Sequence, residues 1–144
     1  MSASADDIED IKRLKALYFR CLDTKDWPGL REVFTDDLVA DSTEAGGQVV
    51  TGADAFITFL QEVLAGATTV HQGHMPEIEL TSPTTATGIW ALHDIVIWPT
   101  GLRLDGHGHY HETYTKTDAG WRIATSRLTR LHTDFRPAPG THPA

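Results

Sequence analysis

The stretch GHGHYHETY carries histidines at every second position, namely His107, His109 and His111. Alternate side chains of a β-strand point to opposite faces, so a strand here would place Tyr110 and Glu112 on the other face. Two ligands spaced by one residue can hold zinc, although such sites usually add ligands from other elements. No CxxC or HExxH pattern accompanies these histidines. We therefore predict that they bind no metal and that the face with Tyr110 and Glu112 forms a pocket wall.

Asp94 is a second candidate for chemistry. It lies in the stretch TGIWALHDIVIW, whose two faces are both apolar, and it shares one face with Trp90. A carboxylate among such neighbours needs a partner or a raised pKa. It either belongs to a functional site or forms a structural ion pair with an arginine, and the sequence leaves both interpretations open.

Asp23 and His71 are single residues in unusual places. Asp23 ends the first expected helix, where the helix dipole disfavours a negative charge by about 0.3–1 kcal/mol. Asp26 can act as a helix cap, whereas Asp23 has no such structural role, which is a hint of function. His71 lies early in an expected strand, where a lone histidine is more often structural than catalytic. His74 falls on the opposite face of that strand, so it cannot share a site with His71.

Three helices are expected in the first half of the chain. Apolar residues recur at steps of three and four from Asp7 to Leu22, which predicts the first helix. The second should begin after a cap at Asp26, with Pro28 in its first turn, and end near the sequence TDD. A short hairpin is expected in STEAGGQVV, and Thr51 should cap the third helix.

The second half of the chain is rich in Val, Ile, Thr, Tyr and Trp, with turns at SPTT, PTGL and DAG. This pattern predicts antiparallel strands joined by short turns. Helices followed by strands indicate the α+β class, with three helices on one face of a curved sheet and a pocket between them. We expect one domain over residues 1–135 and a disordered tail over 136–144. The predicted strands cover residues 68–80, 86–98, 103–117 and 121–133.

The composition excludes several classes of protein. The chain has 144 residues, 40% of them hydrophobic and 22% charged, which fits one globular domain. The net charge is -8 and no Lys/Arg cluster stands out, so we expect no nucleic-acid partner. No apolar run could span a membrane, and with Cys21 as the single cysteine we expect a cytoplasmic protein. The motifs GxGxxG and GxSxG and a phosphate loop are absent, so we expect no nucleotide cofactor.

The order of these parts is similar to that in a known family. The series YFRCLDTKDWPGLREVFTDD, a capped helix, TTVHQGHMPEIEL and GHYHETYTKTDAGWRIATSRL resembles the SnoaL-like branch of the nuclear-transport-factor-2-like superfamily. That branch includes scytalone dehydratase, lindane dehydrochlorinase and bile-acid dehydratases. The resemblance covers roughly residues 8 to 135. It implies a cone-shaped α+β barrel, in which three N-terminal helices pack on a strongly curved antiparallel or mixed sheet that encloses a pocket.

The resemblance also implies a set of site residues. The catalytic Asp–His pair of the family corresponds to Asp23 and His71, and Asp94 falls at the spacing of a further carboxylate in bile-acid dehydratases. Scytalone dehydratase orients water with a second histidine and a tyrosine pair. Here Leu22 precedes the aspartate and Ser42 replaces the second tyrosine, so that arrangement is not reproduced. We assign substrate binding to Tyr18, Trp90, Tyr110, Glu112 and Arg127.

The resulting hypothesis is a cofactor-free, dehydratase-like lyase acting on a small, largely apolar substrate. His71 would abstract a proton, Asp23 would fix its tautomer, and a protonated Asp94 would assist the leaving group or an enolate. Polyketide cyclisation and double-bond isomerisation use the same parts. The same residues also leave room for a non-enzymatic ligand-binding protein, an epoxide hydrolase or a metalloprotein built on the histidine strand. The resemblance further implies a homo-oligomer, either a dimer or a trimer.

Overall fold

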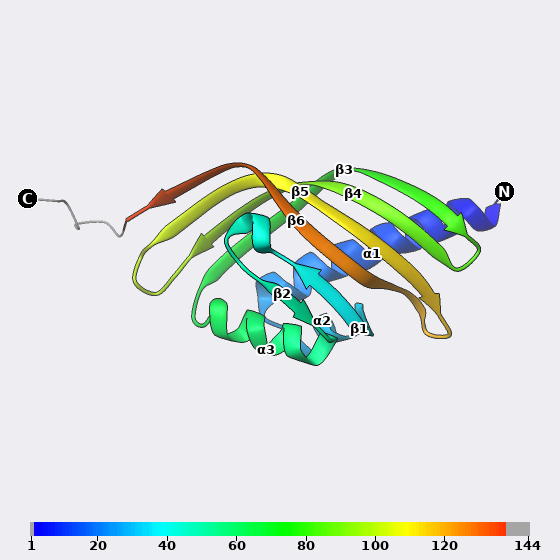
Figure 1. Cartoon of the computed structure of the whole chain (residues 1–144), viewed down its shortest axis with the longest axis horizontal. Helices are drawn as coiled ribbons and strands as arrows, with labels where there is room; N and C mark the ends of the chain where they lie inside the picture. The colour runs from blue at the N-terminus through cyan, green and yellow to red at the C-terminus, as the bar shows by residue number, and fades with distance from the viewer. Residues whose placement is uncertain (1, 138–144) are drawn as a thin grey trace, which may run out of the picture.

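The computed structural model describes residues 2–137 and contains three α-helices, a short 3₁₀ turn and a six-stranded sheet (Figure 1). The predicted α+β class, with helices on a curved sheet, is confirmed. The helical elements are α1 (Ser2–Thr24), α2 (Trp27–Arg31), η1 (Thr43–Ala45) and α3 (Ala53–Val63). The strands are β1 (Phe34–Asp41), β2 (Val49–Thr51), β3 (Thr68–Ser82), β4 (Thr85–Ile97), β5 (Arg103–Thr117) and β6 (Gly120–Arg136).

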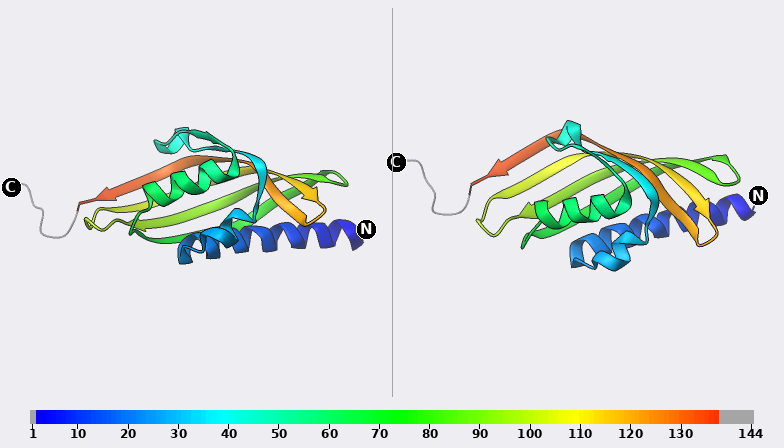
Figure 2. Two further views of the ribbon diagram at one scale, coloured as in Figure 1. Left: turned by 90° about the horizontal axis from the view of Figure 1, so that it is seen from below. Right: turned by 60° about the horizontal axis from the view of Figure 1, so that its bottom comes forward.

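The sheet is mixed and is not closed on itself. Its strand order is β2-β1-β6-β5-β4-β3, and the four long strands β3 to β6 are antiparallel to their neighbours. Strand β1 pairs antiparallel with β2 but parallel with β6. The long strands arch over α1 and α3, which lie on the concave side (Figures 1 and 2). The core between these two layers is where a pocket can form.

Helix α1 packs on the sheet through an apolar stripe. Ile11, Leu14, Tyr18 and Leu22 recur at three- and four-residue steps and are all buried. Lys15 lies on the same stripe and is also fully buried. A lysine in this position must find a partner on the sheet, because an unpaired buried ammonium is costly.

Strand β1 replaces the end of the predicted second helix. The expected helix ran to the sequence TDD, but α2 ends at Arg31 and the chain from Phe34 is a strand. Asp26 does cap α2, since its side chain accepts a hydrogen bond from the Gly29 amide at 3.0 Å. The strand forms because β2 and β6 offer it partners on both sides, which local helical periodicity cannot reveal.

The start of α3 also differs from the prediction. Thr51 ends β2, and the N-cap position is Gly52, which has a φ of 98° and makes no side-chain cap. Asp54, in the first turn of α3, accepts a hydrogen bond from Arg31 at 2.7 Å. This contact ties α3 to α2.

A β-bulge in β6 changes which residues face the core. Thr113 pairs with Thr125, whereas Tyr114 pairs with Ile123, so Ala124 is an extra residue in β6. Odd-numbered residues such as Ile123 face the core before the bulge. From there to a second bulge at Leu131, the even-numbered residues, such as Leu128, face the concave side.

Within residues 2–137, no helix combines the length and the apolar character needed to cross a membrane. The tail predicted for residues 136–144 lies outside the described residues from position 138 onward, and Arg136 is the last residue of β6.

Candidate active site

A cavity of about 650 Å³ lies between the helices and the concave face of the sheet. Helix α3 gives it an apolar wall, and strands β4 and β5 add further apolar side chains. The polar groups on the wall come from several different elements, which brings together residues far apart in the sequence. These polar residues include Tyr18, His71, Asp94, Tyr110 and Arg130, and the apolar wall at α3 consists of Phe56, Phe59, Leu60, Val63 and Leu64.

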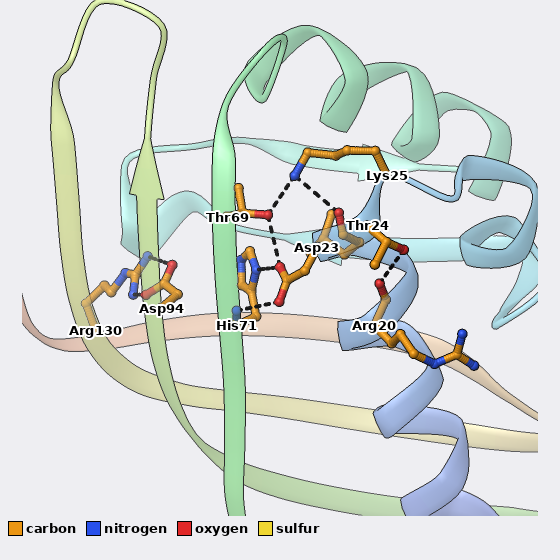
Figure 3. A network of polar contacts seen from close by, with 9 residues as sticks. Arg20, Asp23, Thr24, Lys25, Thr69, His71, Asp94 and Arg130 are labelled. Atoms are coloured by element: carbon orange, nitrogen blue, oxygen red, sulfur yellow. Dashed lines mark hydrogen bonds and ion pairs between the residues drawn. The ribbon is translucent and has the colours of Figure 1, made fainter.

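The structure brings Asp23 and His71 together (Figure 3). The His71 Nδ1 lies 2.7 Å from Asp23 Oδ1, and the backbone amide of His71 donates to Asp23 Oδ2 at 2.8 Å. The aspartate thereby holds both the ring and the backbone of the histidine. Only 9% of the His71 side chain is exposed, and the residue lines the cavity.

Hydrogen bonds from Thr69 and His71 stabilise the negative charge of Asp23 at the C-terminal end of α1. Thr69 Oγ1 donates to Asp23 Oδ1 at 2.9 Å, and Lys25 Nζ donates to Thr69 Oγ1 at 2.7 Å (Figure 3). Burial lowers the pKa of Lys25, although the charge of Asp23 opposes that shift. Three donated hydrogen bonds to one carboxylate offset the unfavourable helix dipole.

The carboxylate of Asp23 decides which tautomer of His71 is present. A carboxylate only accepts hydrogen bonds, so the ring nitrogen facing it carries the proton. In a neutral imidazole the second nitrogen, Nε2, then has a free lone pair. Within residues 2–137 no protein group hydrogen-bonds that Nε2. The pair therefore presents a basic nitrogen on a residue of the cavity wall.

Asp94 forms a bidentate ion pair with Arg130. The guanidinium donates to Asp94 Oδ1 at 2.6 Å and to Oδ2 at 3.0 Å, and Asp94 itself is buried (Figure 3). Burial alone would lower the pKa of Arg130, but the hydrogen bonds and charge of Asp94 outweigh it and the pKa rises. A guanidinium that bonds both carboxylate oxygens is the geometry of a structural ion pair, whereas the family resemblance suggested a protonated Asp94. An arginine partner was one of the two interpretations that the sequence allowed.

Two tyrosines complete the polar part of the wall. The rings of Tyr18 and Tyr110 meet edge to face with their centroids 5.9 Å apart. Burial raises the pKa of both phenols well above the ordinary value, so they stay neutral and can donate hydrogen bonds. The Lys15 ammonium lies 3.8 Å from the centroid of Tyr18 and 3.6 Å from that of Tyr110, a cation–π arrangement that holds both rings.

Glu112 and Trp90 are not part of the cavity wall, although the sequence suggested substrate binding for both. Glu112 is buried and accepts from Lys15 Nζ at 2.9 Å, from the Tyr114 hydroxyl at 2.9 Å and from Ser126 Oγ at 2.9 Å. The Trp90 Nε1 donates to the same Tyr114 hydroxyl at 2.9 Å. These side chains do face inward as predicted, but their polar atoms are engaged within the core.

Arg127, which was predicted to bind substrate, does not line the cavity. It points outward and pairs with Glu44 at 2.7 Å, with 47% of its side chain exposed. The bulge at Ala124 is the cause, because it turns Thr125, Arg127 and Thr129 to the outer face. Arg130 takes the inner position instead, opposite Gly108 of β5.

Sequence reasoning missed Lys15, and it gave Arg130 no role. Lys15 could have been found, because it follows Ile11 by four residues and precedes Tyr18 by three, on the apolar face of its helix. Arg130 could not have been found without knowing where the bulge lies. The row of His107, His109 and His111 projects from the outer face of β5 and does not line the cavity.

Comparisons with known proteins agree with this architecture. A family model for the SnoaL-like domain matches residues 3–127. The protein named Probable cyclase FGR4, from Gibberella zeae, is 24% identical over 144 residues, covering 92% of this chain and 96% of that one. A candidate scytalone dehydratase from Novosphingobium aromaticivorans has a TM-score of 0.85 at 20% identity, covering 99% of each chain. The LinA-type3 hexachlorocyclohexane dehydrochlorinase of Novosphingobium barchaimii has a TM-score of 0.77 at 18% identity, covering 99% of this chain and 94% of that one. At these identities the structural likenesses establish the fold.

Proposed function

The chain belongs to the SnoaL-like family, and from that premise we propose that it is a cofactor-free lyase of the dehydratase type. The observation that carries the proposal is the Asp23–His71 pair, with a Nδ1–Oδ1 distance of 2.7 Å, on the wall of a large and mostly apolar cavity. Such a pair supplies a positioned general base.

His71 performs the first step. Its Nε2 takes a proton from a carbon next to an electron-withdrawing group, and the electrons of the C–H bond become an enolate or a new double bond. Asp23 fixes the ring and stabilises the imidazolium that forms, as a carboxylate does behind any histidine base. In an elimination, the leaving group on the adjacent carbon departs with its bonding electrons as the double bond forms, and a departing hydroxide takes the proton from His71.

Arg130 and the two tyrosines stabilise the charge that develops on the substrate. The guanidinium carries a permanent positive charge, and Tyr18 and Tyr110 are neutral donors at the same wall. Donors fixed in place before the reaction stabilise an oxyanion without having to reorganise. Asp94 then acts as a positioning residue, because it holds Arg130 by two hydrogen bonds.

The cavity limits the substrate to a small and largely apolar molecule with a polar group at one end. Its volume of about 650 Å³ lies in the range of ordinary small-molecule sites. The phenylalanines and leucines at α3 would contact the apolar part of the substrate, while His71, Arg130 and the tyrosines would contact the reacting end.

Cyclisation and double-bond isomerisation begin with the same proton abstraction. The name of the Gibberella zeae relative, Probable cyclase FGR4, favours a cyclase as the second candidate. A ligand-binding protein without activity is the third, and it would need no basic nitrogen on the cavity wall. Cytoplasmic location and a dimeric or trimeric assembly remain predictions from the sequence and the family.

Deuterium exchange tests the proposal without knowledge of the full reaction. The protein would be incubated in D₂O with small cyclic ketones that carry a hydroxyl or chloride on the carbon next to the acidic C–H group. Proton NMR would follow the exchange at the acidic carbon. We expect catalysed exchange with at least one ketone, and a loss of about 10²–10⁴-fold in His71→Ala, the usual contribution of a general base.

The matched control is His74→Ala. His74 lies on the same strand, three residues away, and is exposed rather than in the cavity wall. This variant should exchange at the wild-type rate. Exchange that survives in His71→Ala would refute the assigned base, and an inert wild-type protein that still binds the ketones would favour a ligand-binding protein.

A further inference from the structure

A second cluster of potential ligand atoms lies on the outer face of the sheet. It consists of His93 from β4 and of Asp105 and His107 from β5. One ligand atom from each residue can be chosen so that all three lie within 4.8 Å of one another. None of the three residues lines the cavity.

Strand register explains why these three residues meet. His93 and His107 are direct cross-strand partners, with their rings stacked at 4.3 Å and nearly parallel. Asp105 precedes His107 by two residues and so projects from the same face of β5. The His93 Nε2 already lies 2.9 Å from Asp105 Oδ1. The cluster is therefore built from rigid paired strands rather than from loops.

The ligand set suits a divalent transition metal. Zinc binds imidazole nitrogen and carboxylate oxygen at about 2.0–2.2 Å, which puts two tetrahedral ligands about 3.3–3.5 Å apart. The His93–Asp105 separation of 2.9 Å is close to that spacing, and a ring nitrogen of His107 lies within 4.8 Å of both ligand atoms. An i, i+2 pair on one strand with a third ligand on the neighbouring strand gives three protein ligands and an open fourth position.

We propose that His93, Asp105 and His107 form a binding site for one divalent transition-metal ion of the Zn²⁺ class. The site lies across the sheet from the Asp94–Arg130 pair, because His93 and Asp94 are neighbours that point to opposite faces. Bound metal would cross-link β4 to β5 beneath the cavity.

This inference revises one part of the expectation from the sequence. Of the three histidines on β5, only His107 has ligand partners on the adjacent strand and its own. His109 lies opposite Ala91 and Thr129, and no imidazole or carboxylate stands beside it on either strand. The sequence pattern suggested a row along one strand, whereas the structure favours a group across two.

Arg103 sets a limit on the affinity. Its guanidinium lies 3.6 Å from Asp105 Oδ2 and competes with a metal for the carboxylate charge. The site also lacks the four anionic or neutral ligands that close a structural zinc site. We therefore expect reversible binding that a chelator removes without unfolding the protein.

Calorimetric titration with Zn²⁺ tests the site on the full chain, purified without a histidine tag and stripped of metal by a chelator. We expect one Zn²⁺ per chain and a rise in melting temperature on binding. Removing a residue that only hydrogen-bonds to a metal ligand already weakens metal binding by about 10–100-fold. Removing a direct ligand, in His107→Ala or His93→Ala, should therefore weaken Zn²⁺ binding by about tenfold or more. Both side chains are partly or fully exposed, and circular dichroism would verify that the variants are folded.

The matched control is His111→Ala, which removes a histidine from the same face of the same strand. Its Zn²⁺ affinity should equal that of the wild type, and so should that of His71→Ala, which separates this site from the proposed lyase. No saturable binding below about 100 μM Zn²⁺ would overturn the proposal. Wild-type affinity in both His107→Ala and His93→Ala would overturn it as well.

Discussion

Helix α1 presents charged side chains to two very different regions of the same sheet. Near its middle, Lys15 pairs with Glu112, and both side chains are fully buried. At its C-terminal end, Asp23 pairs with His71, whose ring lies on the wall of an open cavity. The two regions use similar chemical groups, so the difference between them lies in what surrounds those groups.

The sealed region has a protein partner for each charge. The two oxygens of Glu112 accept three hydrogen bonds, and the Lys15 ammonium lies over two tyrosine rings. In the open region, no group of residues 2–137 hydrogen-bonds the Nε2 of His71, and Tyr18 and Arg130 line the same cavity. Buried polar groups whose hydrogen bonds are all made specify a core, whereas polar groups without a partner on a cavity wall are available for chemistry. On this comparison, Lys15 should matter for stability and His71 for turnover.

The largest expected effect concerns the sealed pair. Lys15→Met leaves the Glu112 carboxylate buried without its partner, so the free energy of unfolding should fall by about 3–5 kcal/mol. The double variant Lys15→Met/Glu112→Gln removes both charges and should recover most of that loss. Urea unfolding of the two variants measures both values. If the double variant were as unstable as the single one, packing rather than charge pairing would explain the contribution of Lys15 to stability.

Asp23→Asn should have the next largest effect, on rate. The amide can donate as well as accept, so it no longer forces the proton onto Nδ1 of His71. Deuterium exchange should slow by about 10²-fold, the lower part of the range for positioned bases. Nitrogen-15 NMR of the imidazole should show the Nδ1–H tautomer in the wild type and a mixture in the variant. An unchanged tautomer together with a slow rate would mean that Asp23 acts through charge alone.

Much of this arrangement was predictable from the sequence because its signals are local. The alternation of β-branched and aromatic residues predicted all four long strands, and the odd charge at the end of α1 pointed to Asp23. Non-local features were not predictable. Strand β1 exists because β6 is long enough to pair with it, and its sequence FTDDLVAD carries no clear strand pattern.

The bulge at Ala124 shows the same limit at the level of one residue. Strict alternation from Ile123 puts Arg127 in the pocket, whereas one extra residue puts Arg130 there. Asp94 was predicted to be either a neutral acid or the partner of an arginine. That choice depended on which arginine reached it, and so on the bulge.

Asp94→Asn tests the polar wall of the open region, with a smaller effect than the changes above. A neutral carboxyl at this position would make the substitution mild. Because Asp94 holds the Arg130 guanidinium at 2.6 and 3.0 Å, we expect a stability loss of about 1–3 kcal/mol instead. The exchange rate should fall by about tenfold, since Arg130 loses its orientation. Urea unfolding and proton NMR of the variant measure the two effects.

Glu9→Gln serves as the control for Asp94→Asn. Glu9 pairs with Lys12 on the exposed side of α1 at 3.1 Å, and such surface pairs contribute about 0–1 kcal/mol. The control should change neither exchange nor unfolding measurably. Equal effects of the two variants would mean that the Asp94–Arg130 pair behaves as a surface pair despite its burial.

The smallest effect is expected at the N-terminal end of α1, where Asp7 contacts the sheet beside solvent. Hydrogen bonds from Trp121 and then Lys116 lower the pKa of Asp7, although burial opposes the shift. Between the lowered pKa and the unfolded value of about 3.9 the unfolded chain binds more protons, so stability rises with pH there. The stabilisation by Asp7 is thus complete above about pH 4–5 and is lost as the pH falls through the folded-state pKa.

Asp7→Asn should have a lower melting temperature than the wild type at pH 7, and this difference should narrow in acid. Asp6→Asn, at the exposed neighbour, should show no such gap in melting temperature. A gap that stayed constant from pH 7 to about pH 2 would place the role of Asp7 in packing rather than in its charge.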